Sequence, residues 1–94
     1  MIGMGGWFDA VEVPGTGLYV KPISWAEMSE ILALTEQEQR YRLVERCTCD
    51  EHGVSVLEDG AAGNLPAPLA LRLFDAANRV NSIGSQQVEE TAGN

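Results

Sequence analysis

The chain has 94 residues, with 14 Asp or Glu against six Lys or Arg, and a formal net charge of −8 at pH 7. A chain of this length forms one small domain and buries only about 60 to 65% of the surface that its unfolded form exposes. The charge argues against nucleic-acid binding, which requires Lys and Arg to neutralise phosphates, because the chain has a single lysine.

Both ends of the chain are rich in glycine and small polar residues. Residues 1–6 (MIGMGG) and 84–94 (GSQQVEETAGN) offer little to pack. We therefore expect a disordered N-terminus over 1–6, one folded domain over 7–83 and a flexible acidic tail over 84–94. No apolar run approaches the ~20 residues that span a bilayer, and the glycine-rich start lacks the features of a signal peptide. These patterns predict a soluble cytoplasmic protein with no membrane partner.

Two segments rich in β-branched and aromatic residues come first. Residues 7–13 (WFDAVEV) and 18–23 (LYVKPI) flank a turn containing two glycines at 14–17 (PGTG), a pattern typical of a β-hairpin. Pro22 cannot donate to a β-ladder, so we expect it at the strand's end or on an edge. Because an isolated hairpin is only marginally stable, it must pack on the helices.

Two capping boxes divide the next segment, residues 24–49. Ser24 is followed three residues later by Glu27, and Thr35 by Glu38. In such a box the hydroxyl oxygen accepts the glutamate N–H while the carboxylate reaches back to the backbone N–H of the cap residue. Because a cap residue prefers non-helical backbone angles, the pattern favours two helices over one helix with a hinge at residues 34–35.

Each of these helices has one apolar stripe to bury. The first stripe contains Trp25, Met28, Ile31 and Leu32, and the second contains Tyr41, Val44 and Cys47, with Leu43 at its margin. Trp7 and Trp25 could anchor a partner, as exposed tryptophans often do. Large residues are so few here that we expect both tryptophans in the core instead.

The second half of the chain supplies a short strand, a loop and a last helix. Residues 54–57 (VSVL) predict a third strand, and residues 58–68 are rich in glycine and proline and predict a loop. From Pro68 an apolar stripe recurs at helical spacing up to a stop at Gly84, at positions Leu69, Leu73, Ala77 and Val80. The predicted fold is α+β, an N-terminal β-hairpin with a third short strand packed on about three helices.

Three of the five arginines, Arg40, Arg42 and Arg46, lie together on the second predicted helix. The simpler interpretation is pairing with neighbouring glutamates at i,i+4 spacing. The alternative is a local basic patch for an acidic partner.

One turn gathers the residues most able to bind a metal, Cys47, Cys49 and His52, beside two acids. Structural zinc usually needs a Cys-x-x-Cys pair and a second pair elsewhere, which this chain lacks. A Cys49/His52 pair for acyl chemistry would place nucleophile and base in one turn rather than around a cleft. No glycine-rich phosphate loop lies between a strand and a helix. We predict neither an enzyme nor a cofactor or metal site, but a protein-contact domain.

The order of the segments is also informative. A short strand (AVEVP), LYVKPISWAEMSEIL, a second helix running into CTCDEHGVSVL, a GNLP loop and LALRLFDAANRVNSI followed by VEETAGN resemble the tail assembly chaperones of long-tailed bacteriophages and prophages. The resemblance covers residues 11–94. Its most specific parts are residues 19–27, residues 50–57 and the Arg-Val-Asn helix end with its acidic tail.

The resemblance implies a small acidic protein of the host cytoplasm that is not retained in the mature virion. Such chaperones bind the tape-measure protein, keep it soluble and bring tail-tube subunits to it. In many phages a programmed frameshift also yields a longer form. The resemblance implies no catalytic or cofactor-binding residue.

The partner surface is expected where apolar residues fall off the main stripes, at Leu43 and Leu71. Partly exposed stripes in so small a domain also make a homo-oligomer plausible. An alternative function is a structural minor tail or head-to-tail connector protein retained in the virion. A small regulatory or antitoxin-like adapter unrelated to phage is a third.

Overall fold

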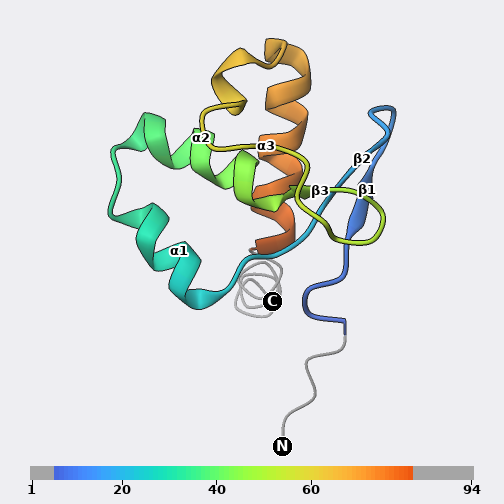
Figure 1. The fold of residues 1–94 in the computed structure, drawn as a ribbon, viewed down its shortest axis with the longest axis horizontal. Coiled ribbons are helices and arrows are strands. Elements are labelled where there is room, and N and C mark those ends of the chain that lie inside the picture. Colours follow the sequence, from blue (N-terminus) through green and yellow to red (C-terminus); the bar gives the residue numbers. More distant parts are fainter. Residues whose placement is uncertain (1–5, 82–94) are drawn as a thin grey trace, which may run out of the picture.

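The computed structural model describes residues 6–81 and confirms the α+β fold, with an N-terminal hairpin, a third strand and three α-helices (Figure 1). The elements in chain order are β1 (Val11–Val13), β2 (Leu18–Val20), α1 (Trp25–Leu32), α2 (Glu36–Cys47), β3 (Thr48–Cys49), the 3-10 helix η1 (Ala62–Asn64) and α3 (Ala67–Asn81). The predicted acidic tail, the helix stop at Gly84 and all but one residue of the predicted disordered N-terminus lie outside the described residues.

The strands form an antiparallel sheet in the order β1-β2-β3, in which Val20 lies opposite both Val11 and Thr48. Between β1 and β2, Gly15 and Gly17 have φ of 80° and 74°, angles that L side chains rarely adopt, so the predicted turn requires its glycines. The hairpin is shorter than predicted, because regular pairing ends at Val20. Pro22 follows the end of the strand, as expected.

The third strand exists but not where the sequence predicted it. The strand that pairs with β2 is Thr48–Cys49, directly after α2, rather than residues 54–57. The chain then reverses at residues 50–53, and the predicted strand returns along the other side of β3 with a single bridge between Cys49 and Ser55. Val54 and Val56 are exposed because no element covers that return segment.

The two capping boxes form and separate the helices, which confirms two helices. The Ser24 Oγ accepts the Glu27 N–H at 3.2 Å, and the Thr35 Oγ1 accepts the Glu38 N–H at 3.3 Å. The second half of each box differs from the expected pattern, because the glutamate carboxylate accepts from the cap hydroxyl, at 3.4 Å and 3.1 Å, instead of from the backbone N–H of the cap residue. Each helix therefore begins where a side chain satisfies an orphan N–H group.

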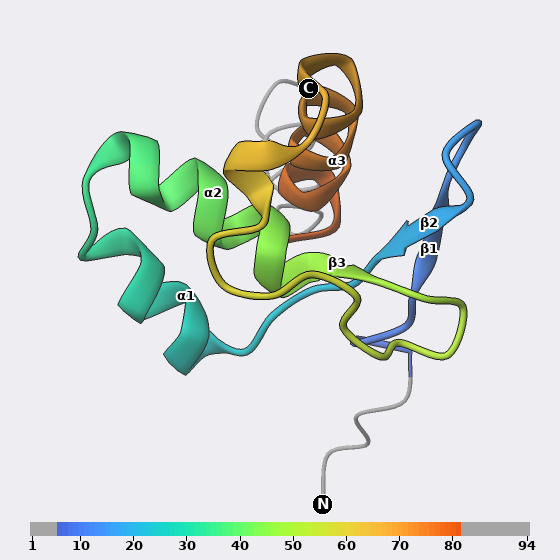
Figure 2. The ribbon, with the colours of Figure 1, turned by 45° about the horizontal axis from the view of Figure 1, so that its top comes forward.

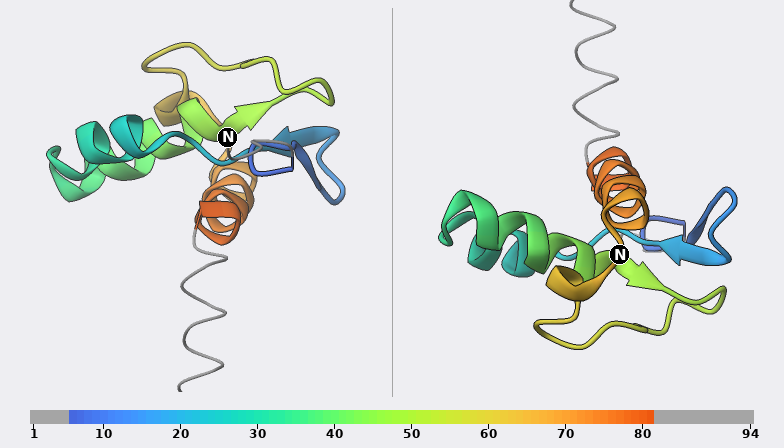
Figure 3. Two further views of the ribbon diagram at one scale, coloured as in Figure 1. Left: turned by 90° about the horizontal axis from the view of Figure 1, so that it is seen from below. Right: turned by 90° about the horizontal axis from the view of Figure 1, so that it is seen from above.

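The core lies around α2 and α3. Figure 3 shows α1 and α2 on one side of α3 and the strands on the other. The inward residue of each hairpin strand, Val13 and Val20, packs with Leu73 and Ala77, which confirms the predicted stripe of the last helix. Its proline in the first turn, Pro68, costs no hydrogen bond there. None of the helices within residues 6–81 is long and apolar enough to cross a bilayer.

Asn81, the last residue of α3, ties three segments together (Figure 2 gives their arrangement). Its Oδ1 accepts the Ile23 N–H at 3.0 Å, and its Nδ2 donates to the Ala77 carbonyl at 2.8 Å and to the Cys47 Sγ at 3.3 Å. The side chain thus joins the end of α3 to the segment entering α1 and to the end of α2. This places the three helices relative to one another.

Both tryptophans are exposed, so their predicted burial is wrong. Trp7 is 68% exposed in a turn before β1, and Trp25 is 87% exposed as the first residue of α1. The helix rests on α2 through Ile31 and Met28, so its first turn extends beyond the packed surface. Tyr41 also lies outside the core, because the buried arc of α2 is centred on Leu43, Val44 and Cys47.

Candidate protein-binding groove

An apolar groove lies where α1 and α3 both pack on α2. We call it the helical groove, and its volume is about 330 Å³. It is lined by Met28, Ile31 and Leu32 of α1, by Glu36, Gln39, Arg40 and Leu43 of α2, and by Phe74 and Asn78 of α3. The helix caps and the hydrogen bonds of Asn81 fix the positions of the three helices. The helical groove is therefore a feature of the folded domain.

Leu43 forms part of the floor of this groove. The expectation that it lies off the buried stripe is wrong, because the side chain is only 7% exposed and belongs to the core. The physical reason is that α2 is covered by α1 on one side and α3 on another, which widens its buried arc. A partner could reach Leu43 only at the bottom of the helical groove.

Leu71 is 66% exposed, as its position off the main stripe predicted. It precedes Phe74 by three residues and Asn78 by seven, so the three share one face of α3. Opposite them, Leu32 of α1 is 63% exposed at the groove's other wall. The exposed apolar surface therefore continues from the groove along α3 towards Leu71.

The rim of the groove is polar and locally balanced in charge. Arg40 Nη2 pairs with Glu36 Oε1 at 2.9 Å across one turn of α2, and both side chains are exposed. Gln39 Nε2 donates to the carbonyls of Leu32 and Leu34 at 3.3 Å and 2.9 Å, which ties the end of α1 to α2. An apolar floor inside a polar rim is the usual anatomy of a protein-binding surface.

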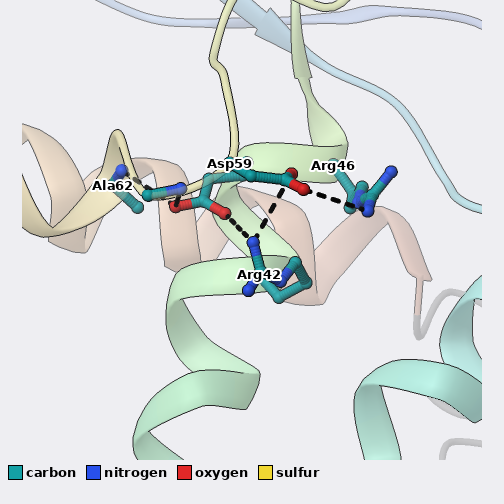
Figure 4. A network of polar contacts seen from close by, with 6 residues as sticks. Arg42, Arg46, Asp59 and Ala62 are labelled. Carbon is teal, nitrogen blue, oxygen red and sulfur yellow. Dashed lines mark hydrogen bonds and ion pairs between the residues drawn. The ribbon is translucent and has the colours of Figure 1, made fainter.

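The arginines of α2 are engaged by acids, which supports pairing over a free basic patch. Arg40 pairs with a glutamate at the predicted i,i+4 spacing, whereas Arg42 and Arg46 both contact Asp59 in the loop (Figure 4). Arg42 Nη1 lies 3.4 Å from Asp59 Oδ1, and Arg46 Nη2 lies 3.7 Å from Asp59 Oδ2. These contacts attach the 58–64 loop to α2.

Glu45 is the buried centre of that network and was not singled out from the sequence. Its carboxylate is paired with Arg42 Nη1 at 2.9 Å and accepts the N–H groups of Gly60 and Ala62 at 2.9 Å and 3.0 Å. A buried carboxylate requires such partners. The only sequence signal was Arg42 three residues before it, which is also common on exposed helices.

The cysteine-histidine turn has structural roles. Cys47 and Cys49 are free and buried, and burial raises the pKa of both thiols, to about 11 for Cys47. The Asp50 Oδ1 accepts the N–H groups of Val54 and His52. These hydrogen bonds lower the pKa of the Asp50 carboxyl, and the bond from Val54 has the larger effect. The His52 side chain is exposed, whereas both thiols are buried.

The same turn carries the residue types most able to bind a metal. Within residues 6–81, no three or more His, Cys, Asp or Glu side chains are grouped so that they could hold a metal ion. A neutral buried thiol is a poor nucleophile and a poor ligand, since the thiolate is the reactive form. The helical groove is thus the better candidate site.

Comparisons of the chain with models of protein families, with curated proteins and with solved structures found no match.

Proposed function

We propose that this chain is a phage tail assembly chaperone that holds an amphipathic helix of a tape-measure protein in the helical groove. The observation that supports the proposal best is the apolar surface formed by the groove and its extension to Leu71. Leu32 and Leu71 are each more than 60% exposed there, although a small soluble domain gains nothing by leaving leucines in water.

The shape of the groove suits a helical partner. An amphipathic helix lays residues at i, i+3, i+4 and i+7 into a hydrophobic groove, and such anchors need apolar contacts on both walls and on the floor. Here α1 supplies one wall through Leu32, α3 the other through Phe74, and Leu43 the floor. A tape-measure protein is long, helical and apolar along its seam, so before the tail tube encloses it such a seam requires a cover.

The charge of the chain supports the same role. With a net charge of −8, a complex of this chain and an apolar helix would repel other copies of itself and stay dispersed. The charged pair on the rim, Arg40 and Glu36, leaves the groove mouth without a strong field of either sign. Apolar contact rather than ion pairing would therefore provide most of the affinity. Recruitment of tail-tube subunits remains part of the proposal, without a surface assigned to it.

Co-expression with tape-measure fragments tests the groove. Leu32→Asp places a charge on one wall of the groove and Leu71→Asp places one on its extension along α3, and each should abolish the soluble fragment while leaving the circular dichroism spectrum unchanged. Val54→Asp is the matched control, because Val54 is 60% exposed but lies outside the groove. Leu43→Asp is uninformative, since a buried charge would unfold the core.

The outcomes separate the alternatives. If both leucine variants keep the fragment as soluble as the control does, the helical groove is not the contact. A dimer seen by analytical ultracentrifugation and lost in the same variants would assign the groove to a second copy of the chain. Detection of the protein by mass spectrometry in purified virions would favour a structural tail or connector protein over a chaperone.

A further inference from the structure

The outer edge of β1 has unpaired backbone groups. Lys21 N–H donates to the Cys47 carbonyl at 3.0 Å, so the backbone groups of Lys21 point towards β3. Because successive residues of a strand point their backbone groups to opposite sides, those of Val20 face β1, where its partner is Val11. The N–H and C=O of Glu12 consequently point away from β2. Since β1 is an edge strand, no described residue pairs with them.

A second groove, which we call the edge groove, runs between β1 and α3. Its volume is about 360 Å³. Val11 and Val13 of β1 and Ala76 and Val80 of α3 give it an apolar lining, and Val11 is half exposed. A strand added beside β1 would point every second side chain into this space, because side chains alternate between the two faces of a sheet.

The charge within the edge groove is also distinctive. Arg72 and Arg79 of α3 both line it, and Arg79 is paired with Asp75 at 3.2 Å. The other arginines of the chain each have an acid partner, whereas among the described residues no acid lies within ion-pair distance of Arg72. A cation left unmatched in a chain of net charge −8 favours a ligand that brings its own carboxylate.

We propose that the edge groove binds an extended segment of a partner protein by strand addition to β1. The segment's backbone would pair with the N–H and C=O of Glu12, its apolar side chains would cover Val11 and Ala76, and one carboxylate would meet Arg72. The edge groove is independent of the helical groove, which is lined by α1, α2 and other residues of α3 and suits a helical rather than an extended ligand.

A second copy of this chain is a poorer occupant. Glu12 is the one residue of β1 with outward backbone groups, so a symmetric antiparallel pair would have to centre on it. That register places Glu12 opposite the same residue of the other copy, and like charges directly opposite are destabilising. Two chains that each carry −8 add a general repulsion.

The test is a selection of displayed random peptides, about eight residues long, against the full chain. The recovered peptides should have an apolar residue at every second position. They should also have an Asp or Glu at one common position. Their binding should shift the NMR signals of β1 and of the Arg72 flank of α3. Glu12→Pro removes the outward N–H without removing a β1–β2 bond, because proline is tolerated on an edge strand. This variant and Arg72→Ala should each weaken binding by about tenfold or more, whereas Arg46→Ala, an exposed arginine outside both grooves, should not.

The proposal is overturned if the selection yields no binder, or if the recovered peptides bind Glu12→Pro as tightly as the unchanged chain. It is equally overturned if peptide binding shifts the NMR signals of α1 and Phe74 instead. That result would show that the peptides bind the helical groove. A dimer that Glu12→Pro dissociates would replace the partner segment with a second copy. Retention of the amide spectrum by both variants is the control for folding.

Discussion

Helices α1 and α2 begin with the same device and differ in almost everything that follows. Each has a hydroxyl cap and a glutamate three residues later. Yet α1 fully buries only Ile31, whereas α2 buries Leu43, Val44, Glu45 and Cys47. Local sequence therefore starts both helices equally well, and tertiary packing decides which of them holds the domain together.

This difference in burial also gives the two helices different roles, α2 in the core and α1 at the surface. Neighbours cover α2 on several sides, so its side chains are committed to the core and to the loop network. Among the described elements, α1 packs extensively only on α2. This leaves a surplus of its apolar side chains exposed to water. Trp25 and Leu32, both exposed, belong to that surplus. An element held on one side is free to offer another side to a partner.

Breaking the buried network of α2 should produce the largest loss of stability. Glu45→Ala leaves two buried N–H groups without their acceptor and removes one of the two acid partners of Arg42, and we expect the free energy of unfolding to fall by about 3 kcal/mol in urea denaturation. Asp75→Ala, which removes an exposed i,i+4 pair, should cost less than about 0.5 kcal/mol. Equal losses in the two variants would show that the loop network does not anchor α2.

The end of α2 should make stability sensitive to alkaline pH. Burial raises the Cys47 pKa from 9.0 to about 11. Below pH 9 the thiol is protonated in both states and its contribution is complete. Between those two values the unfolded chain loses the proton first, so stability should fall by up to roughly 3 kcal/mol and then level off.

A Cys47→Ala variant isolates that contribution, because other groups also titrate at alkaline pH. Its stability, measured by urea denaturation from pH 8.5 upwards, should decline less steeply than that of the unchanged chain. Parallel curves for the two proteins would contradict the assignment. Alkylation of both thiols in the folded chain should also be slow at pH 8, since both are buried and protonated.

Removing the caps should sharpen the contrast between the helices. Ser24→Ala and Thr35→Ala should each cost about 1 kcal/mol. We expect native-state hydrogen exchange to place the loss differently, since weakly packed elements open locally. Ser24→Ala should accelerate exchange in α1 alone, and Thr35→Ala should accelerate it throughout the domain. Identical exchange patterns would show that the helices open as one unit.

The smallest effect is expected where the largest side chain is removed. Trp25→Ala should change the free energy of unfolding by less than about 0.5 kcal/mol, because the indole is 87% exposed. Val44→Ala, a smaller truncation in the core, should cost about 2 kcal/mol. Thermal or urea denaturation of both variants measures the difference. A larger loss for Trp25→Ala would mean that the indole packs against the chain in solution.

The parts of the fold that depend on neighbours in sequence could be predicted. Ser24 and Thr35 correctly predicted the two helix starts, and the glycines of residues 14–17 predicted the hairpin turn. The apolar stripe around Leu73 predicted the inward face of α3. Each is a local effect, a hydrogen bond within four residues or a repeat of 3.6 residues.

The failures have a common cause, which is coverage by distant elements. Residues 54–57 have the composition of a strand, but the position beside β2 is occupied by Thr48–Cys49, which follows α2 directly. Leu43 is buried because two helices flank α2, and Trp25 is exposed because none covers the first turn of α1. The candidate site shows the same division, since Leu71 was correctly placed in solvent and Leu43 was not.

The sequence by itself determined the α+β class, the two helix starts, the hairpin turn and the net charge of −8. Only the tertiary structure decided which apolar residues are covered, because covering a side chain requires an element that arrives from elsewhere in the chain. Two of the partners of Glu45 are N–H groups of a loop 15 and 17 residues away, and the two grooves exist only where elements distant in sequence meet.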